Sequence, residues 1–167
     1  MYIQTKSYDE IIVQAKKKSE MLASIPAIQP CHKYTRIASG FGVRIHPILK
    51  VRKFHKGIDF AADRGTPVYA TGDGVILKTK KNLGGYGNEI VINHDFGYQT
   101  RYAHLQKFLI RKGQKIKRGQ LIGYVGNTGS STGPHLHYEV LKNGKHVNPV
   151  HYFFKDLTPK EYEIILK

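Results

Sequence analysis

The chain has 167 residues, with 27 lysines and arginines against 12 aspartates and glutamates, and a formal net charge of +15. This length suits one compact domain with short appendages. The charge indicates an anionic partner, such as nucleic acid, a phospholipid surface or an anionic cell-wall polymer, and does not choose among them. The single cysteine, Cys31, excludes an intramolecular disulfide and a cysteine-based zinc site.

The N-terminal segment is predicted to be a helix followed by an extended linker. Ser7 and Glu10 have the spacing of a capping box. An apolar stripe follows at helical spacing: Tyr8, Ile11, Ile12, Ala15 and Leu22. The prolines in "SIPAIQPCHKY" end the helix, and Cys31 is expected to be a free thiol in this linker.

From Ser39 to Phe154 the pattern changes to short strands separated by glycine turns. The predicted strands are 67–71, 74–80, 89–94, 98–105, 120–126 and 135–142. Closely spaced strands without crossover helices indicate a mainly β fold with an antiparallel sheet. The tail "LTPKEYEIILK" predicts a short C-terminal helix, capped by Thr158 and begun by Pro159.

Three histidine-containing motifs are candidates for chemistry. "HKGIDF" places His55 and Asp59 four residues apart, and "HLH" places His135 and His137 on one face of a strand. Catalytic zinc sites use three protein ligands and leave one position open, and two histidines with one carboxylate form such a set. His55, Asp59 and one histidine of the pair would supply it. The other histidine and His104, in "RYAHL", would remain for acid–base work.

Together these motifs resemble the lysostaphin-type (LytM-domain) zinc metallopeptidases that cleave peptidoglycan peptides. The similarity runs from "SGFGVRIHP" through "GYGNEIVINHDFGYQTRYAHL" to "GPHLHYEV" and "VNPVHYF". It implies one zinc ion held by His55, Asp59 and His137, with His104 and His135 as the catalytic pair. It also implies a division into an N-terminal helix and linker (1–38), the LytM-type zinc peptidase domain (39–154) and a C-terminal helix (155–167).

The resemblance further implies an antiparallel β core with zinc in a groove that binds an extended peptide. "NLGGYGN", which contains Asn88, and "GNTGSSTG" are expected to form the groove walls, with Asn88 as a substrate-binding candidate. Arg44 could bind a substrate carboxylate or form a surface salt bridge. Glu139 could orient a ligand or face solvent.

Some lysostaphin-like members carry a tyrosine shortly before the first zinc histidine, and "PILKVRKF" contains none. This departure favours cross-links between D-amino acids over glycine bridges as the substrate. Peptidoglycan peptides and the anionic cell envelope are the expected partners. The N-terminus lacks the order of a signal peptide, so we expect an excised soluble part of an exported or membrane-anchored protein of the bacterial cell envelope, periplasmic or extracellular.

Two other functions remain open. A LytM-like domain that has lost its metal residues, or whose groove the N-terminal helix occludes, could act as a scaffold that regulates other wall hydrolases. All five zinc and catalytic positions are present here, which favours the enzyme. A nucleic-acid binder is suggested only by the charge, and no recognition helix or aromatic stacking motif accompanies it, so no specific nucleic acid is expected. The oligomeric state is left open.

Overall fold

A computed structural model describes residues 2–31, 35–45, 48 and 50–153. Within these residues, one helix is followed by twelve strands and a short 3-10 helix. Their bounds are α1 (Tyr2–Ser24), β1 (Arg36–Ser39), β2 (Gly42–Ile45), β3 (Arg52–His55), β4 (Ile58–Ala61), β5 (Pro67–Tyr69), β6 (Gly74–Lys80), β7 (Asn88–Asn93), β8 (Tyr98–Phe108), β9 (Lys115–Ile116), β10 (Leu121–Val125), β11 (His135–Lys142), β12 (Lys145–Val147) and η1 (Pro149–Tyr152).

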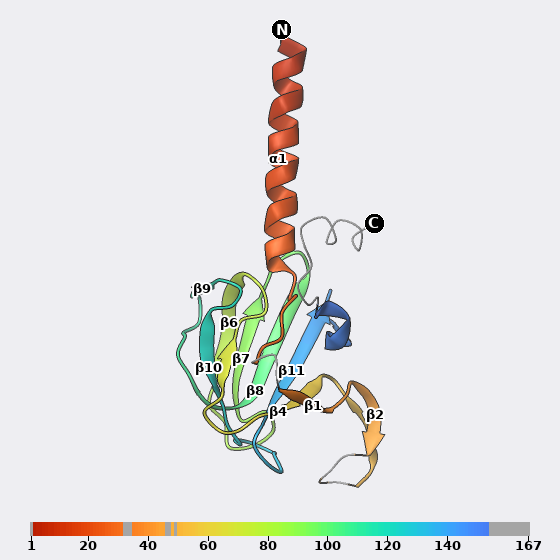
Figure 1. The fold of residues 1–167 in the computed structure, drawn as a ribbon, viewed down its shortest axis with the longest axis vertical. Coiled ribbons are helices and arrows are strands. Elements are labelled where there is room, and N and C mark those ends of the chain that lie inside the picture. Colours follow the sequence, from red (N-terminus) through yellow and green to blue (C-terminus); the bar gives the residue numbers. More distant parts are fainter. Residues whose placement is uncertain (1, 32–34, 46–47, 49, 154–167) are drawn as a thin grey trace.

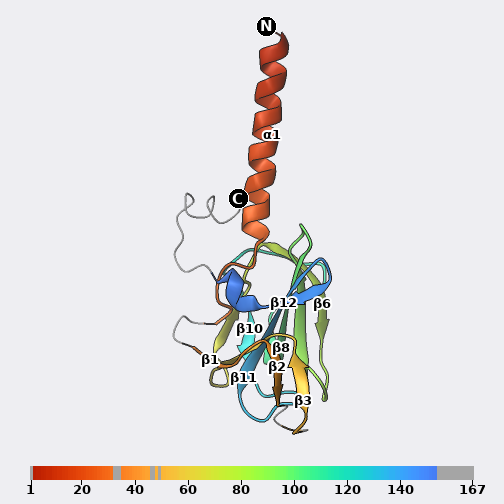
Figure 2. The ribbon, with the colours of Figure 1, turned by 90° about the vertical axis from the view of Figure 1, so that its right-hand side faces the viewer.

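The strands form one large antiparallel sheet and one small hairpin (Figures 1 and 2). The main sheet has the order β1-β4-β11-β8-β7-β6-β9, with β12 on β11 and with β10 pairing both β5 and β8. The hairpin consists of β2 and β3, and it lies at the end of the molecule remote from α1 (Figures 1 and 2). The prediction of a mainly β, antiparallel fold is confirmed, as are the six predicted strands to within a few residues.

Strand alternation divides the sheet into a core face and a site face, which is clearest on β11. Leu136, Tyr138 and Val140 are fully buried in the hydrophobic core. His135, His137 and Glu139 alternate with them and therefore lie on the other face. The core side chains anchor β11 between β4 and β8, and this anchoring fixes the positions of the alternating polar residues.

Helix α1 extends away from the sheet, so most of its length contacts no other element (Figure 1). It begins at Tyr2, a turn earlier than the predicted cap at Ser7, so the capping-box prediction is wrong. The predicted apolar stripe is exposed, with Tyr8, Ile11 and Ile12 each more than half accessible. No helix within the described residues combines the length and the apolar character needed to cross a bilayer.

The C-terminal end of α1 is held to the sheet domain by Arg118. Its guanidinium donates to the carbonyl oxygens of Leu22, Ala23 (3.0 Å) and Ile25 (3.1 Å). Leu22 and Ala23 are in the last turn of α1, where carbonyls lack intrahelical partners, and a cation is favourable at this end of the helix dipole. The Asp73 amide also donates to Ala23 O (2.8 Å).

The segment after α1 is not helical, as predicted, but it is packed rather than a free linker. Ile25, Ala27 and Cys31 are each less than 5% exposed. The amide of Tyr69, on β5, donates to Pro30 O (2.8 Å). Cys31 is a free thiol, and burial raises its pKa to about 12. The predicted C-terminal helix, 155–167, lies outside the described residues.

Candidate metal centre and active site

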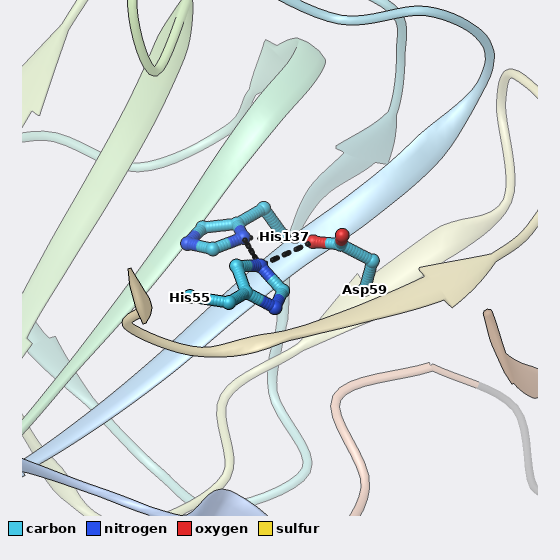
Figure 3. A group of neighbouring side chains, drawn as sticks. All are labelled: His55, Asp59 and His137. Carbon is cyan, nitrogen blue, oxygen red and sulfur yellow. Dashed lines mark hydrogen bonds and ion pairs between the residues drawn. The ribbon is translucent and has the colours of Figure 1, made fainter. Parts of the chain in front are cut away.

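His55, Asp59 and His137 meet at one point on the site face of the sheet (Figure 3). His55 ends β3, Asp59 lies in β4 and His137 lies in β11. Asp59 and His137 are register partners, so their side chains project from the same face. One ligand atom from each residue lies within 4.8 Å of the others, and all three side chains are buried.

Gly57 lets the turn between β3 and β4 pass close to β11. A Cβ at this position would lie 2.2 Å from the backbone oxygen of Tyr138, a distance that real Cβ atoms do not adopt. Glycine is therefore required for the chain to bring His55 and Asp59 together against β11. This close approach gives a structural reason for the spacing of the "HKGID" motif.

The hydrogen bonds of the two imidazoles leave one nitrogen of each ring facing the cluster. His55 Nδ1–H donates to Gly40 O (2.6 Å), and His137 Nε2–H donates to Glu139 Oε1 (3.0 Å). The other nitrogens, His55 Nε2 and His137 Nδ1, lie 3.1 Å apart and within 3.2 Å of Asp59 Oδ1. Two imidazole nitrogens and a carboxylate oxygen converge here. With these two nitrogens in the unprotonated form that binds a metal, the donor set fits zinc.

Electrostatics around Asp59 maintain the carboxylate in its charged form. Burial alone would raise its pKa, but the hydrogen bonds and charges of His137 and His55 outweigh burial and lower the pKa well below its ordinary value. Asp59 Oδ2 also accepts from Arg44 (3.1 Å). Both carboxylate oxygens therefore have partners, which restricts rotation of the side chain.

Glu139 is a fully buried carboxylate behind His137 and accepts hydrogen bonds from several groups. Besides His137, its partners are the Tyr86 hydroxyl (2.6 Å), Arg101 Nη1 (2.9 Å) and His146 Nε2 (3.2 Å). Burial opposes ionisation of Glu139, but the His137 and Tyr86 hydrogen bonds and the nearby positive charges lower its pKa to about 2. Glu139 therefore does not face solvent, and its bond to His137 is of the kind that would orient a metal ligand.

His104 reaches the site face through an irregularity in β8. The register pairs Asn88 with Leu105 but Ile90 with Tyr102, so β8 contains one extra residue at this point. His104 has a φ of 60°, in the left-handed region. Its Nδ1–H donates to Thr128 O (2.7 Å), and burial lowers its pKa to about 4.

His135 lies beside His104, with their ring centroids 4.7 Å apart. Its Nδ1–H donates to Gly133 O (2.8 Å), and its Nε2 is 3.9 Å from Asp59 Oδ1. The five histidine and aspartate candidates line one open cavity of about 720 Å³. None of residues 2–31 lines this cavity, so α1 does not cover it in the described structure.

The structure places the two substrate-binding candidates differently. Arg44 lines the cavity and is 30% exposed at its side chain. Asn88 is not among the lining residues, because its amide donates to Leu105 O (3.0 Å) and Gln106 O (3.1 Å) and joins β7 to β8. The segment around it does contribute to the wall through Gly85 and Tyr86. The second predicted wall contributes residues 130–133, and Pro134 extends it by one residue.

Three residues of the site were not singled out by the sequence: Tyr86, Arg101 and His146. The Tyr86 ring packs on His137, with ring centroids 5.7 Å apart. The guanidinium carbon of Arg101 lies 4.4 Å from the centroid of the Tyr86 ring. Register could have identified Arg101, because it is paired with Glu139 across β8 and β11. Tyr86 lies in a loop whose position no strand pattern predicts.

Comparison with known proteins relates this chain to one peptidase family. The profile of peptidase family M23 matches residues 53–149, more than half of the chain. A solved structure described as a zinc-containing peptidase from Vibrio cholerae superposes with a TM-score of 0.67 at 45% identity, over 77% of this chain and 39% of that one.

Two curated relatives are also similar. DD-carboxypeptidase/endopeptidase Mpg of Neisseria meningitidis serogroup B is 56% identical over 117 residues, covering 70% of this chain and 27% of the relative. Peptidoglycan DD-endopeptidase ShyA of Vibrio cholerae is 52% identical over 120 residues, covering 71% and 28%. The matched region thus spans little more than a quarter of the length of these relatives.

Proposed function

Because this chain belongs to peptidase family M23, we propose that it is a zinc-dependent endopeptidase that hydrolyses peptide bonds in peptidoglycan stem peptides or cross-links. This membership agrees with the resemblance to LytM-type peptidases that the sequence motifs indicated. The names of the two curated relatives support cross-links between D-amino acids as the bonds cleaved. These relatives act on peptidoglycan or on DD-peptide bonds according to their names.

The observation that carries the proposal is the convergence of two groups of side chains on one cavity. His55, Asp59 and His137 would hold the zinc ion, while His104 and His135 lie beside them. When bound, zinc supplies Lewis acidity, which polarises a carbonyl group and lowers the pKa of coordinated water to about 7.

The protein's own residues would manage the proton of the attacking water. The Nδ1–H groups of His104 and His135 are each used by a backbone carbonyl, which leaves Nε2 of each ring as a proton acceptor. We assign this pair two steps: accepting a proton from the water that attacks the amide carbonyl, and delivering a proton to the leaving nitrogen. The proton taken from water thus equals the proton given to the nitrogen when one amide bond is hydrolysed.

The place of action that we propose is the bacterial cell envelope. Peptidoglycan lies there, and the formal charge of +15 would favour an anionic envelope surface over a neutral one. This attraction is electrostatic and is expected to weaken as ionic strength increases.

Digestion of purified sacculi, followed by mass spectrometry of the released fragments, tests the function. The zinc-loaded chain should release peptides, while His135→Ala and the chelated protein should release none above background. His151→Ala, which replaces an exposed histidine outside the cavity lining, serves as the matched control and should retain full activity. Release that persists in both the His135 variant and the chelated sample would exclude the zinc mechanism.

A further inference from the structure

The cavity has one cationic wall and one uncharged wall. The cationic wall comes from the β2–β3 hairpin and the turn that follows it, and comprises Arg44, Lys53 and Lys56. A second part of the lining consists of Gly85, Tyr86 and residues 130–134, which carry hydroxyl groups, glycine and proline but no charged group. A ligand in this cavity therefore meets positive charge at one part of the lining.

The cationic wall retains the capacity to bind an anion. Arg44 and Lys53 are register partners in the hairpin, so they project from the same face. In the described part of the chain, Asp59 is the partner of Arg44, and neither Lys53 nor Lys56 has a hydrogen-bond or ion-pair partner. A guanidinium has five N–H donors, so one bond to Asp59 leaves others for a second carboxylate.

The position of Arg44 relates this anion to the scissile bond. Asp59 Oδ2 accepts from Arg44, while Oδ1 of the same carboxylate faces His55 and His137. One carboxylate group therefore separates the guanidinium from the candidate metal centre. An anion held by Arg44 would therefore lie close to the candidate metal centre, as a carboxylate next to the bond that is cleaved would.

The structure of an amide bond indicates which of the two residues at the cleaved bond can carry this anion. The α-carboxyl of the residue on the acyl side is consumed in the scissile amide. Only the residue that contributes the nitrogen can carry a free carboxylate on the carbon attached to that nitrogen. We infer that Arg44, assisted by Lys53 and Lys56, binds this carboxylate of the leaving residue.

This inference rests on the proposed function and narrows its substrate class. The preferred substrates are amides whose leaving group is an amino acid with a free carboxylate beside the scissile nitrogen. A C-terminal peptide bond has this structure, and so does a cross-link to an amino acid whose neighbouring carboxylate is free. Amidation of that carboxylate should remove the preference, because a neutral amide cannot form the charge-assisted pair.

Two synthetic cross-linked peptides that differ only at this carboxylate, free in one and amidated in the other, test the inference. For the full zinc-loaded chain, kcat/KM is expected to be about 10-fold or more higher for the free acid. Arg44→Ala should reduce this ratio to near one, and Arg44→Lys should give an intermediate value. Arg52→Ala is the matched control, because Arg52 is an exposed arginine of β3 outside the cavity lining, and it should leave the ratio unchanged.

Using a ratio separates this effect from damage to the metal centre. Loss of the Arg44–Asp59 contact could lower zinc occupancy, but occupancy scales both rates equally and cancels in the ratio. Equal cleavage of both peptides by the unmodified chain would overturn the inference while supporting the proposed endopeptidase activity. An unchanged preference in Arg44→Ala would also overturn it. Cleavage of neither peptide, nor of sacculi, would instead contradict the proposed function itself.

Discussion

Glu139 accepts hydrogen bonds from four side chains, and it should control zinc affinity without touching substrate. It is fully buried and accepts from His137, Tyr86, Arg101 and His146. Glu139→Gln places an amide N–H₂ among these donors and weakens the orientation of His137. Zinc affinity is expected to fall about 10- to 100-fold, measured by competition with a chelating dye.

Glu89 provides the control for this change. It is also a buried carboxylate and contacts Arg101 and Lys78, but no contact joins it to His55, Asp59 or His137. Glu89→Gln should therefore disturb the charge network while leaving zinc affinity nearly unchanged. If both variants lose zinc equally, Glu139 acts through general stability and not through His137.

His94 is a second buried side chain with a measurable consequence, this time for the pH dependence of stability. Its Nδ1–H donates to Asp73 O (2.8 Å), and Thr100 Oγ1 lies 2.7 Å from Nε2. Burial lowers its pKa from 6.5 to about 4. The unfolded state therefore binds more protons than the folded state between these values, and stability falls as the pH decreases through this window.

The expected loss from this one group between pH 7.5 and pH 5 is about 2 kcal/mol. Urea unfolding of the unmodified chain and of His94→Gln at both pH values measures the contribution of His94 to this loss of stability. The other titrating groups are common to both proteins and cancel in the comparison. The variant should be less stable at pH 7.5 but should lose less on acidification. Parallel pH profiles would show that His94 is not the group responsible.

At the level of elements, β8 shows where strand alternation fails to predict the site. Tyr102 is buried in the core and pairs with Tyr138, and Ala103 pairs with His137 on the site face. Regular alternation would then return His104 to the core face with Tyr102. The extra residue in β8 reverses this order and brings His104 to the cavity. No residue pattern in "RYAHL" predicts that reversal, whereas the alternation of "HLHYEV" was sufficient for β11.

The left-handed φ at His104 predicts an unusual order of variant stabilities. Val is normally more stable than Gly in a strand, because Gly loses more backbone entropy. At φ 60° a β-branched side chain is strained, so His104→Val should be less stable than His104→Gly by about 1–2 kcal/mol. Both variants lose the bond to Thr128, so this loss cancels. Urea unfolding in the presence of chelator measures the difference, and a more stable Val variant would contradict it.

For the whole molecule, the sequence predicted the β domain better than its attachment to the N-terminal segment. Histidine and aspartate spacings depend on local strand geometry, so the motifs identified residues that do converge. Contacts across long sequence separations carry no such local signal. Arg118 capping α1 and Cys31 joining the core are contacts of this kind, and both were missed. For the same reason, "SIPAIQPCHKY" looked like a linker although much of it is buried.

Two truncations test this organisation. Residues 7–20 are exposed throughout. Deletion of residues 2–18 should therefore shift Tm by no more than a few degrees and should leave the rate of peptide hydrolysis unchanged. Deletion of residues 1–38 removes the buried side chains Ile25, Ala27 and Cys31 together with most of β1, and should lower Tm by about 10 °C or more. Differential scanning calorimetry and the sacculus assay measure both effects. Faster hydrolysis by the shorter deletion would instead indicate that α1 occludes the groove.

The burial of Cys31 gives the chain an intrinsic chemical reporter. A thiol with a pKa of about 12 and 4% exposure has almost no thiolate available to an alkylating reagent in the native state. Modification therefore requires the segment after α1 to detach from the sheet, and the labelling rate measures how often it does so. Because Cys31 is the only cysteine, no other thiol contributes to this signal. Mass spectrometry of a labelling time course would thus follow local opening in the unmodified protein, at equilibrium and without denaturant.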